Sequence, residues 1–294
     1  MSFLLIGGDS EIGSATLAYL RRRGMPAVAT TRRADRGGGS ERLFLDLGVP
    51  LDGWEPPAGV EAACVLAAVG HLVDCHRDPV GSALINVTRT VALVERLVAA
   101  GIYTLFLSTN QVFDGSRPHE PATAPLCPVS EYGRQKARTE TRLRTLMTAG
   151  APVGILRLGK VVAPGMSLLR QWQAALALGQ PVRAFRDMVM APTPIGIAAA
   201  AIAHLLAGRC PGTWQLTGPQ DVAYGDVAAF IARRLDVDPT LVEPVAAASA
   251  ATPEGSTPQH TTLDSRALRV HFGIASPEPW PTIEGILAAP ETAA

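Results

Sequence analysis

The chain uses very little lysine. Of its 26 lysine and arginine residues only Lys136 and Lys160 are lysines, and 26 acidic residues bring the formal net charge to zero. A protein whose main partner is nucleic acid or an anionic membrane surface usually carries an excess of basic residues. We therefore expect neither partner, although this composition still allows a local basic pocket for a phosphorylated small molecule.

Cysteine and histidine are sparse and scattered. None of the four cysteines has a close partner in the sequence, and none of the six histidines falls in a zinc-binding spacing such as H-x-x-x-H. We therefore predict free thiols and no metal site. The first residues, MSFLLIGGD, contain no basic segment, and the apolar stretch 195–207 is too short to cross a bilayer. A soluble cytoplasmic protein is expected.

Aromatic residues make up only 5% of the chain and apolar residues 47%, so the core is mostly aliphatic. Apolar strands alternate with helical segments, which predicts an α/β fold with a doubly wound parallel (Rossmann) sheet. The predicted strands are 3–6, 28–31, 43–46, 62–68, 104–108, 153–158 and 213–217, and the predicted helices are 14–23, 79–100, 132–149, 193–207 and 224–235. We place a dinucleotide-binding domain at 1–163 and a smaller substrate-binding region at 164–294, with segments expected to return to the first domain.

The segment IGGDSEIGSA, residues 6–15, lies between the first predicted strand and the first predicted helix. Gly7 and Gly13 occupy positions where a dinucleotide-binding turn needs glycine, and Ser10 replaces the middle glycine. The Ser10 hydroxyl is expected to donate to a phosphate oxygen, and the first backbone N–H groups of the helix favour an anion. A plain strand–glycine–helix turn is the alternative. The residues assigned to the phosphate site are Gly7, Ser10, Glu11, Ile12 and Gly13.

Two arginines, Arg32 and Arg33, follow the second predicted strand. Their forked N–H groups suit the 2′-phosphate of NADP, whereas an NAD site usually has an acidic residue there. NADP is therefore predicted over NAD, with two solvated arginines as the plain alternative. After the third predicted strand, Asp46 and Leu47 are placed to flank the adenine ring, although a surface turn has the same pattern.

Tyr132 and Lys136 are four residues apart in a predicted helix and therefore share one face. An ordinary phenol has a pKa near 10, and a neighbouring ammonium is expected to lower the pKa of the Tyr132 phenol. The ammonium also fits the nicotinamide ribose more compactly than a guanidinium would. This role would explain a lysine in an arginine-rich chain, and a solvated Tyr/Lys face is the alternative.

The strand predicted at 104–108 leads into LSTNQVFDG, residues 107–115. Ser108 and Thr109 therefore lie at the carboxyl edge of the predicted sheet, where such folds bind ligands. We predict that the Thr109 hydroxyl hydrogen-bonds a substrate carbonyl and that Ser108 lies against the cofactor. The simpler alternative is that both residues only terminate the strand.

Together these features resemble the extended short-chain dehydrogenase/reductases, and specifically the dTDP-4-dehydrorhamnose reductase group of sugar-nucleotide reductases. The resemblance spans nearly the whole chain. It rests on the glycine turn, AAVGHLVDCHRDPVGSALINV (67–87), STNQVFDG (108–115), Tyr132-x-x-x-Lys136, ILRLGKVVAPG (155–165), GQPVRAFRDMVMAPTPI (179–195) and TTLDSRALRVHFGI (261–274).

The resemblance implies NADP(H)-dependent reduction of a keto group on a nucleotide-activated deoxysugar. Tyr132 would be the general acid, Lys136 its electrostatic partner and ribose ligand, and Thr109 the hydroxyl that orients the carbonyl. Asn86 would support the segment after the fourth strand, whose residues expected to line the cofactor are Ala67, Ala68 and Val69. A homodimer is also compatible with this resemblance.

Asn110 and Gln111 depart from the pattern of these reductases, S-T-D-Y-V-F, which has Asp-Tyr in their place. They are expected to face the substrate, so the sugar preference and the activity itself are open. The related 4,6-dehydratases place Asp-Glu there to move protons on sugar carbons, and neutral amides cannot do this.

Two other functions stay open at this point. One is a sugar-nucleotide epimerase with retained NAD, against which the two arginines after the second strand speak mildly. The other is a non-catalytic NADP-binding subunit, because the regulatory subunit of methionine adenosyltransferase resembles the same reductase group. For the substrate diphosphate the sequence offers four basic residues without choosing among them: Arg170, Arg183, Arg186 and Lys160.

Overall fold

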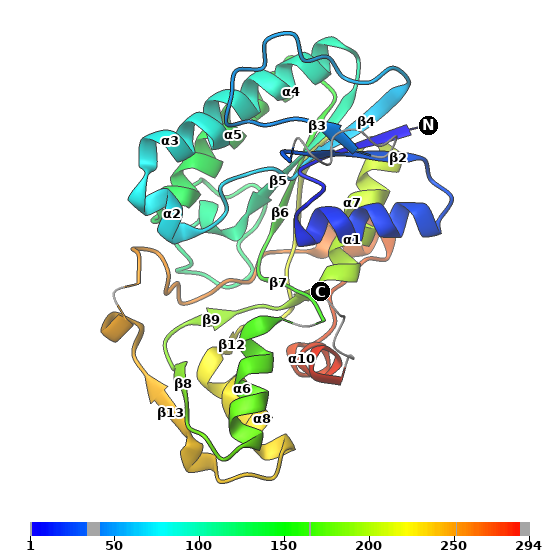
Figure 1. Ribbon diagram of the computed structural model, residues 1–294. Coiled ribbons are helices and arrows are strands. Elements are labelled where there is room, and N and C mark those ends of the chain that lie inside the picture. The colour runs from blue at the N-terminus through cyan, green and yellow to red at the C-terminus, as the bar shows by residue number, and fades with distance from the viewer. Residues whose placement is uncertain (1, 34–41, 165, 251, 289–294) are drawn as a thin grey trace.

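The computed structural model describes residues 2–33, 42–164, 166–250 and 252–288, which form a larger lobe built on a parallel sheet and a smaller lobe beside it (Figure 1). The sheet has seven strands in the order β11-β6-β5-β4-β1-β2-β3. Every neighbouring pair in it is parallel. The predicted doubly wound α/β fold with a smaller C-terminal region is therefore confirmed.

The central strands are buried on both faces, as expected for a parallel sheet covered by helices. No residue of β5 or β6 is exposed. The strands of this sheet are β1 (Ser2–Ile6), β2 (Ala27–Thr31), β3 (Arg42–Phe44), β4 (Val60–Val65), β5 (Tyr103–Thr109), β6 (Val153–Leu158) and β11 (Gly212–Leu216).

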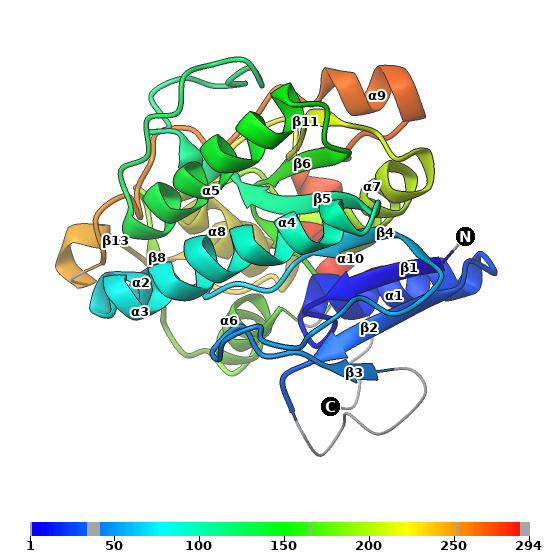
Figure 2. The same cartoon turned by 90° about the horizontal axis from the view of Figure 1, so that it is seen from above.

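Two helices cover each face of the sheet. On one face, α1 (Glu11–Arg22) packs against α7 (Ile195–Gly208) over an aliphatic core. On the other, α4 (Thr90–Ala99) and α5 (Glu131–Thr148) run side by side over a second core (Figure 2). This two-sided cover leaves the carboxyl ends of the strands as the open edge of the sheet.

The helix predicted at 79–100 is confirmed as a continuous helical run over residues 79–99, made of α3 (Pro79–Ala83), a π-helical turn η2 (Leu84–Arg89) and α4. The short helix α2 (Leu72–Arg77) that precedes it was not predicted. Asp78 caps α3 and Pro79 opens it, which is a favoured start for a helix. The π-helical turn widens the backbone at Asn86, whose buried side chain contacts the neighbouring elements.

The smaller lobe has its own core around Trp172. Its helices are α6 (Ser167–Ala177), α8 (Tyr224–Arg234) and α10 (Pro279–Ala288). Short strands complete it: β8 (Val182–Phe185) pairs parallel with β13 (Val242–Val245), and β9 (Val189–Met190) pairs antiparallel with β12 (Val222–Ala223).

The C-terminal half of the chain contributes to both lobes. β7 (Val161–Val162) pairs with β10 (Thr193–Pro194) where the chain crosses between them. α7 and β11 then return to the larger lobe, and α9 (Arg266–Phe272) packs on β11. The division at residue 163 itself stays a prediction. Among the described helices, none combines the length and apolar character needed to cross a membrane.

Candidate functional site

The strand order reverses between β1 and β4, and ligands of such sheets bind at the carboxyl ends of the strands flanking this point. Gly7 lies there with φ +93°, and a Cβ atom on it would come within 2.7 Å of the Ala67 nitrogen. A Cβ on Gly13 would come within 2.5 Å of the Gly7 oxygen. Both positions therefore need glycine, which leaves a tight backbone cradle at the start of α1.

Ser10 caps α1 and does not present a free hydroxyl hydrogen. Its Oγ donates to the Gly7 oxygen at 2.8 Å and accepts from the Gly13 nitrogen at 3.1 Å. This geometry differs from the expected bond to a phosphate, because a cap uses the hydroxyl locally. The N–H groups of Glu11 and Ile12, in the first turn of α1, have no acceptor within the helix and suit a diphosphate oxygen.

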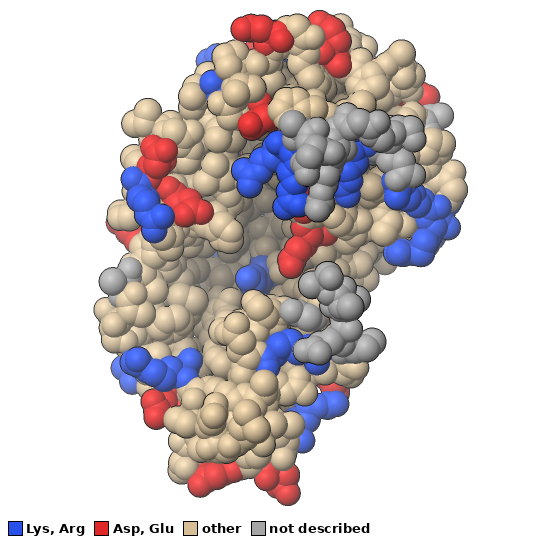
Figure 3. Space-filling view, viewed as in Figure 1, with Lys and Arg blue, Asp and Glu red and all other residues tan. Residues whose placement is uncertain are grey.

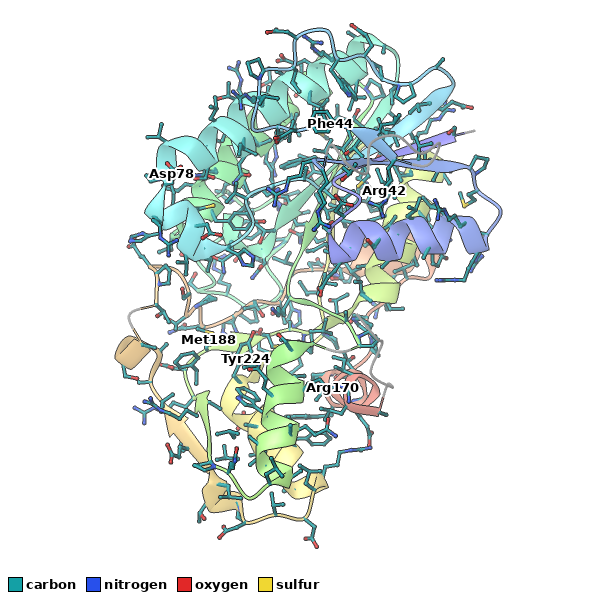
Figure 4. All side chains as sticks on the ribbon, in the orientation of Figure 1. Arg42, Phe44, Asp78, Arg170, Met188 and Tyr224 are labelled. Atoms are coloured by element: carbon teal, nitrogen blue, oxygen red, sulfur yellow. The ribbon has the colours of Figure 1, made fainter. Side chains whose placement is uncertain are left out.

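The glycine turn also contains an acidic residue, Asp9, that the sequence pattern did not single out and that lies next to the end of β2. Asp9 accepts a hydrogen bond from Thr31 Oγ1 at 2.5 Å and is paired with Arg42 on β3. The arginine compensates the charge that Asp9 would otherwise present to a 2′-phosphate. The glycine turn and the ends of β2 and β3 are thus tied together, and Figure 4 labels Arg42 and Phe44 on this edge of the larger lobe.

The other residues predicted for the adenosine end of the site differ in exposure: the two arginines are exposed, whereas Leu47 is buried. Arg32 and Arg33 are exposed just beyond β2, next to residues 34–41, which lie outside the described part of the chain. The Asp46 carboxylate accepts from the Gly48 nitrogen at 2.7 Å and so shapes a turn. Leu47 is buried in the core, and its carbonyl accepts a hydrogen bond from Arg89, so only the neighbouring backbone is placed to border an adenine.

The segment after β4 lies directly against the glycine turn. Ala67 donates its N–H to the Ile6 carbonyl at 2.9 Å, and Ala68 is exposed. Asn86 holds Val69 from both sides: its Oδ1 accepts from the Val69 nitrogen at 2.8 Å, and its Nδ2 donates to the Val69 oxygen at 3.0 Å. A buried amide with these partners fixes the backbone path of the wall of the crevice.

The helix α5 begins next to the end of β5. Ser130 caps it by accepting from the Gly133 nitrogen at 3.0 Å, and a Cβ on Gly133 would come within 2.1 Å of the Gln111 oxygen. This close approach places the first turn of α5, with Tyr132, against the residues that follow Thr109. The structure therefore brings Thr109, Tyr132 and Lys136 to one edge of the sheet.

Lys136 is buried beneath Tyr132. Its Nζ donates to the Leu107 carbonyl at 2.8 Å and lies 4.4 Å from the centroid of the Phe106 ring and 5.9 Å from that of Tyr132. Burial lowers the pKa of Lys136 from 10.5 to about 8, while the nearby Glu140 carboxylate acts in the opposite direction. The ammonium is thus held by a strand carbonyl and two aromatic rings.

The pKa of Tyr132 moves in the opposite direction to our expectation. Burial of the half-buried phenol raises its pKa above the ordinary value, because desolvation disfavours the phenolate. Among the described residues no protein group is hydrogen-bonded to its hydroxyl. A phenol that keeps its proton can act as a general acid, which is the role that reduction of a carbonyl needs.

Thr109 and Ser108, at the end of β5, point to different partners. Thr109 Oγ1 accepts from the Gln111 nitrogen at 3.2 Å and caps the short turn η3 (Asn110–Val112). Ser108 Oγ donates to buried Glu140 at 2.6 Å, so only its backbone is left for the predicted cofactor contact. Successive residues of a strand face opposite sides of the sheet, which explains why these two buried side chains have different partners.

A fully buried ion pair lies behind this edge. Arg157 donates to Glu140 through Nε at 3.0 Å and through Nη2 at 2.7 Å, and neither side chain is exposed. Arg157 also reaches Gln215 on β11 at 2.9 Å and stacks on Phe113. These bonds tie β5, β6, β11 and α5 together beneath the catalytic candidates.

The predicted substrate residues Asn110 and Gln111 line a cavity of about 270 Å³ between the lobes. The surface is hollowed between the lobes, with a basic side chain inside the hollow and both basic and acidic side chains along its rim (Figure 3). Figure 4 shows Met188 and Tyr224, two other lining residues, at the top of the smaller lobe, facing the sheet. Of the four basic candidates for the substrate diphosphate, only Lys160 lines this cavity.

The remaining three bases lie elsewhere in the smaller lobe. Arg170 donates to the Ile286 carbonyl of α10 at 3.4 Å, and Arg183 and Arg186 are exposed outside the cavity lining. A larger hollow of about 580 Å³ lies between α4 and α5, but none of the predicted site residues lines it. Over the described residues, no group of three or more acidic, histidine or cysteine side chains is placed to hold a metal ion.

Comparisons with known proteins agree with this architecture. The family model described as the RmlD substrate binding domain matches residues 1–289. None of the curated proteins compared with the chain matches it significantly. A dTDP-4-dehydrorhamnose reductase from Clostridium acetobutylicum superposes with a TM-score of 0.79 at 19% identity, over 98% of each chain.

Two further solved structures show the same fold. The dTDP-4-dehydrorhamnose reductase of Bacillus anthracis in complex with NADP has a TM-score of 0.79 at 15% identity, over 97% of each chain. The UDP-glucose 4-epimerase of Thermus thermophilus in complex with NAD has a TM-score of 0.79 at 20% identity, over 99% of this chain and 100% of that one. The structural likeness supports the fold, and the match of the family model over nearly the whole chain identifies this protein as a member of the RmlD substrate-binding domain family.

Proposed function

We propose that this protein is an NADP(H)-dependent reductase of a keto group on a nucleotide-activated deoxysugar. The observation that carries the proposal is the placement of Tyr132 and Lys136 on one face of α5, against the end of β5 that bears Thr109. The printed names of two similar structures support the reaction class, since both are dTDP-4-dehydrorhamnose reductases.

NADPH, when bound, supplies the hydride that attacks the carbonyl carbon. Tyr132 donates its phenolic proton to the carbonyl oxygen as the negative charge develops there, and solvent later restores that proton. Lys136 stabilises the phenolate left behind, because its ammonium lies 5.9 Å from the centre of the phenol ring. The Thr109 hydroxyl hydrogen is directed to Asn110 Oδ1 at 3.3 Å in this structure. When substrate binds, it turns to the carbonyl oxygen and orients it, which holds the reacting groups in one cleft.

The glycine cradle and the start of α1 would hold the cofactor diphosphate. Arg32 and Arg33 would bind a 2′-phosphate, and the pairing of Asp9 with Arg42 makes this end of the site compatible with a second negative group. These surroundings favour NADP over NAD as the proposed cofactor.

The proposal is tested by following NADPH oxidation with a panel of dTDP-, UDP- and GDP-4-keto sugars. We expect turnover with at least one of them and a loss of about 10²–10⁴-fold in Tyr132→Phe, because that variant lacks the acidic proton. Tyr19→Phe, in α1, is the matched control and should retain the rate, because its partly buried ring packs against the core of the larger lobe and is not among the predicted site residues. No turnover with any sugar, or an undiminished rate in Tyr132→Phe, would refute the proposal.

A further inference from the structure

The cavity between the lobes has side-chain hydrogen-bond donors that lack an acceptor among the described residues. Its walls come from Leu72 of α2, η3, the segment after β6, β9, the first residue of α8 and the segment 256–261, which adds the hydroxyl-bearing Ser256 and Thr261. Of the described residues that line it, Lys160 alone is charged, and none carries a carboxylate. The following argument rests on the proposed function, because it concerns the substrate of that same site.

The orientation of the Gln111 amide follows from its neighbours. Ser130 Oγ already accepts a hydrogen bond from the Gly133 nitrogen at 3.0 Å, so its own hydrogen is available to donate. It donates to Gln111 Oε1 at 3.1 Å, which identifies that atom as the amide oxygen. The Nε2 group of Gln111 therefore keeps its two hydrogens, and no acceptor for them is found among the described residues.

The Asn110 amide is oriented by the same reasoning. Thr109 Oγ1 accepts from the Gln111 nitrogen at 3.2 Å, and its hydrogen is directed to Asn110 Oδ1 at 3.3 Å. Asn110 Nδ2 is thus the second donor at this cavity without an acceptor in the described parts of the chain. Asn110 and Gln111 stand where the related reductases have Asp and Tyr. At position 110 an amide that can donate hydrogen bonds therefore replaces a carboxylate.

Lys160 adds the third donor and a full positive charge. Its side chain is exposed and makes no hydrogen bond or ion pair with any described residue, while its carbonyl accepts from the Thr193 nitrogen. The Asp221 carboxylate near the cavity is already engaged, since Thr261 donates to it from Oγ1 at 2.5 Å and His260 lies 3.3 Å away. Lys160 therefore has no counter-charge in this part of the site.

We propose that Lys160, with the amides of Asn110 and Gln111, binds an oxyanion of the substrate. Three donors that line one cavity, with no carboxylate among its described lining residues, match a group that only accepts hydrogen bonds, namely a carboxylate or a phosphate. Because Asn110 directly follows Thr109, this group lies close to the reacting carbonyl. The oxyanion is either a carboxylate on the sugar ring or the diphosphate that joins sugar and nucleoside.

Calorimetric titration in the presence of NADP⁺ tests this assignment without turnover. The ligands are UDP, UDP-glucose and UDP-glucuronate, with dTDP and dTDP-glucose for the other base. Lys160→Gln removes the charge at similar length, Lys160→Arg restores it, and Arg183→Gln removes an exposed arginine of the same lobe as the matched control. Thermal unfolding of each variant shows that the fold is retained.

We expect Lys160→Gln to weaken binding of the anionic ligands about 10- to 100-fold, as loss of a charged hydrogen bond does. Lys160→Arg should recover most of the affinity, and Arg183→Gln should leave it unchanged. A loss confined to UDP-glucuronate identifies the sugar carboxylate, and an equal loss with UDP or dTDP identifies the diphosphate.

Unchanged affinities in Lys160→Gln would overturn the proposal, as would the absence of binding of every ligand to the wild-type protein. The reductase proposal is judged separately, by NADPH oxidation and the Tyr132→Phe variant. Loss of the oxyanion effect with NADPH oxidation intact would therefore refute only the role of Lys160.

Discussion

Replacing Lys136 by methionine should abolish turnover and yet stabilise the cofactor-free protein near neutral pH. The side chain is 3% exposed, and burial lowers its pKa from 10.5 to about 8. Keeping the ammonium charged in this environment costs the folded state roughly 3 kcal/mol near pH 7. Methionine fills a similar volume without a charge, and the lost bond to the Leu107 carbonyl offsets only about 1 kcal/mol of the gain.

The pH dependence of this difference gives the sharper test. Because the folded-state pKa lies below the unfolded value, the unfolded state binds more protons between about pH 8 and 10.5. The wild-type protein therefore gains stability from this group as the pH rises through that window, whereas Lys136→Met does not. The advantage of the variant should shrink by roughly 2–3 kcal/mol between about pH 7 and 10.

Urea unfolding of wild type and variant at several pH values measures this quantity, because contributions from other groups largely cancel in the difference. The control is Lys160→Met, which removes the other lysine of the chain at an exposed position. Two results would contradict the claim that burial of the Lys136 ammonium destabilises the folded state. One is a Lys136→Met variant that is clearly less stable than wild type at neutral pH, and the other is a difference in stability that does not vary with pH.

Two further predictions concern the buried ion pair and the cofactor. Arg157→Met should lower the free energy of unfolding by roughly 3–5 kcal/mol, because it removes the only fully buried cation paired with Glu140 among the described residues and leaves it the half-exposed Arg144 at 3.5 Å and the Ser108 hydroxyl. Arg157→Met/Glu140→Leu should cost less than that single change. Additive losses in urea unfolding would contradict this coupling. Arg32→Ala/Arg33→Ala should weaken NADPH binding about 10- to 100-fold in a fluorescence titration and leave NADH binding nearly unchanged. An equal loss for both cofactors would remove the two arginines from the 2′-phosphate site.

The sheet of the larger lobe was predictable because its strands carry a strong local signal. β1, β5 and β6 are mostly apolar and are separated by long helical segments. The strands of the smaller lobe carry no such signal. β9 and β12 have two residues each, and β13 contains a proline, so their pairing depends on contacts that only the folded chain provides.

The candidate site likewise has features that local sequence predicts and features that depend on tertiary contacts. The spacing of Tyr132 and Lys136 on one helix and the position of Thr109 at a strand end follow from local periodicity. The pairing of Asp9 with Arg42 does not, because the two residues are 33 positions apart and meet only through the register of β2 and β3. Tertiary contacts likewise decided which of the four candidate bases lines the cavity.

The structure corrects two expectations from the sequence: the role of the Ser10 hydroxyl and the direction in which the pKa of Tyr132 is shifted. Ser10 uses its hydroxyl as a helix cap, so the phosphate donors at this turn are backbone groups. The pKa of the Tyr132 phenol is raised, because burial disfavours the phenolate, and burial cannot be read from a four-residue spacing.

A crystal structure with NADP⁺ bound tests the central claim most directly. We predict that the nicotinamide ring lies at the carboxyl end of β5, that Lys136 Nζ reaches the adjoining ribose, and that the hydroxyls of Thr109 and Tyr132 both face C4 of the ring. A ring bound elsewhere, or a different side chain inserted between it and Tyr132, would contradict the account.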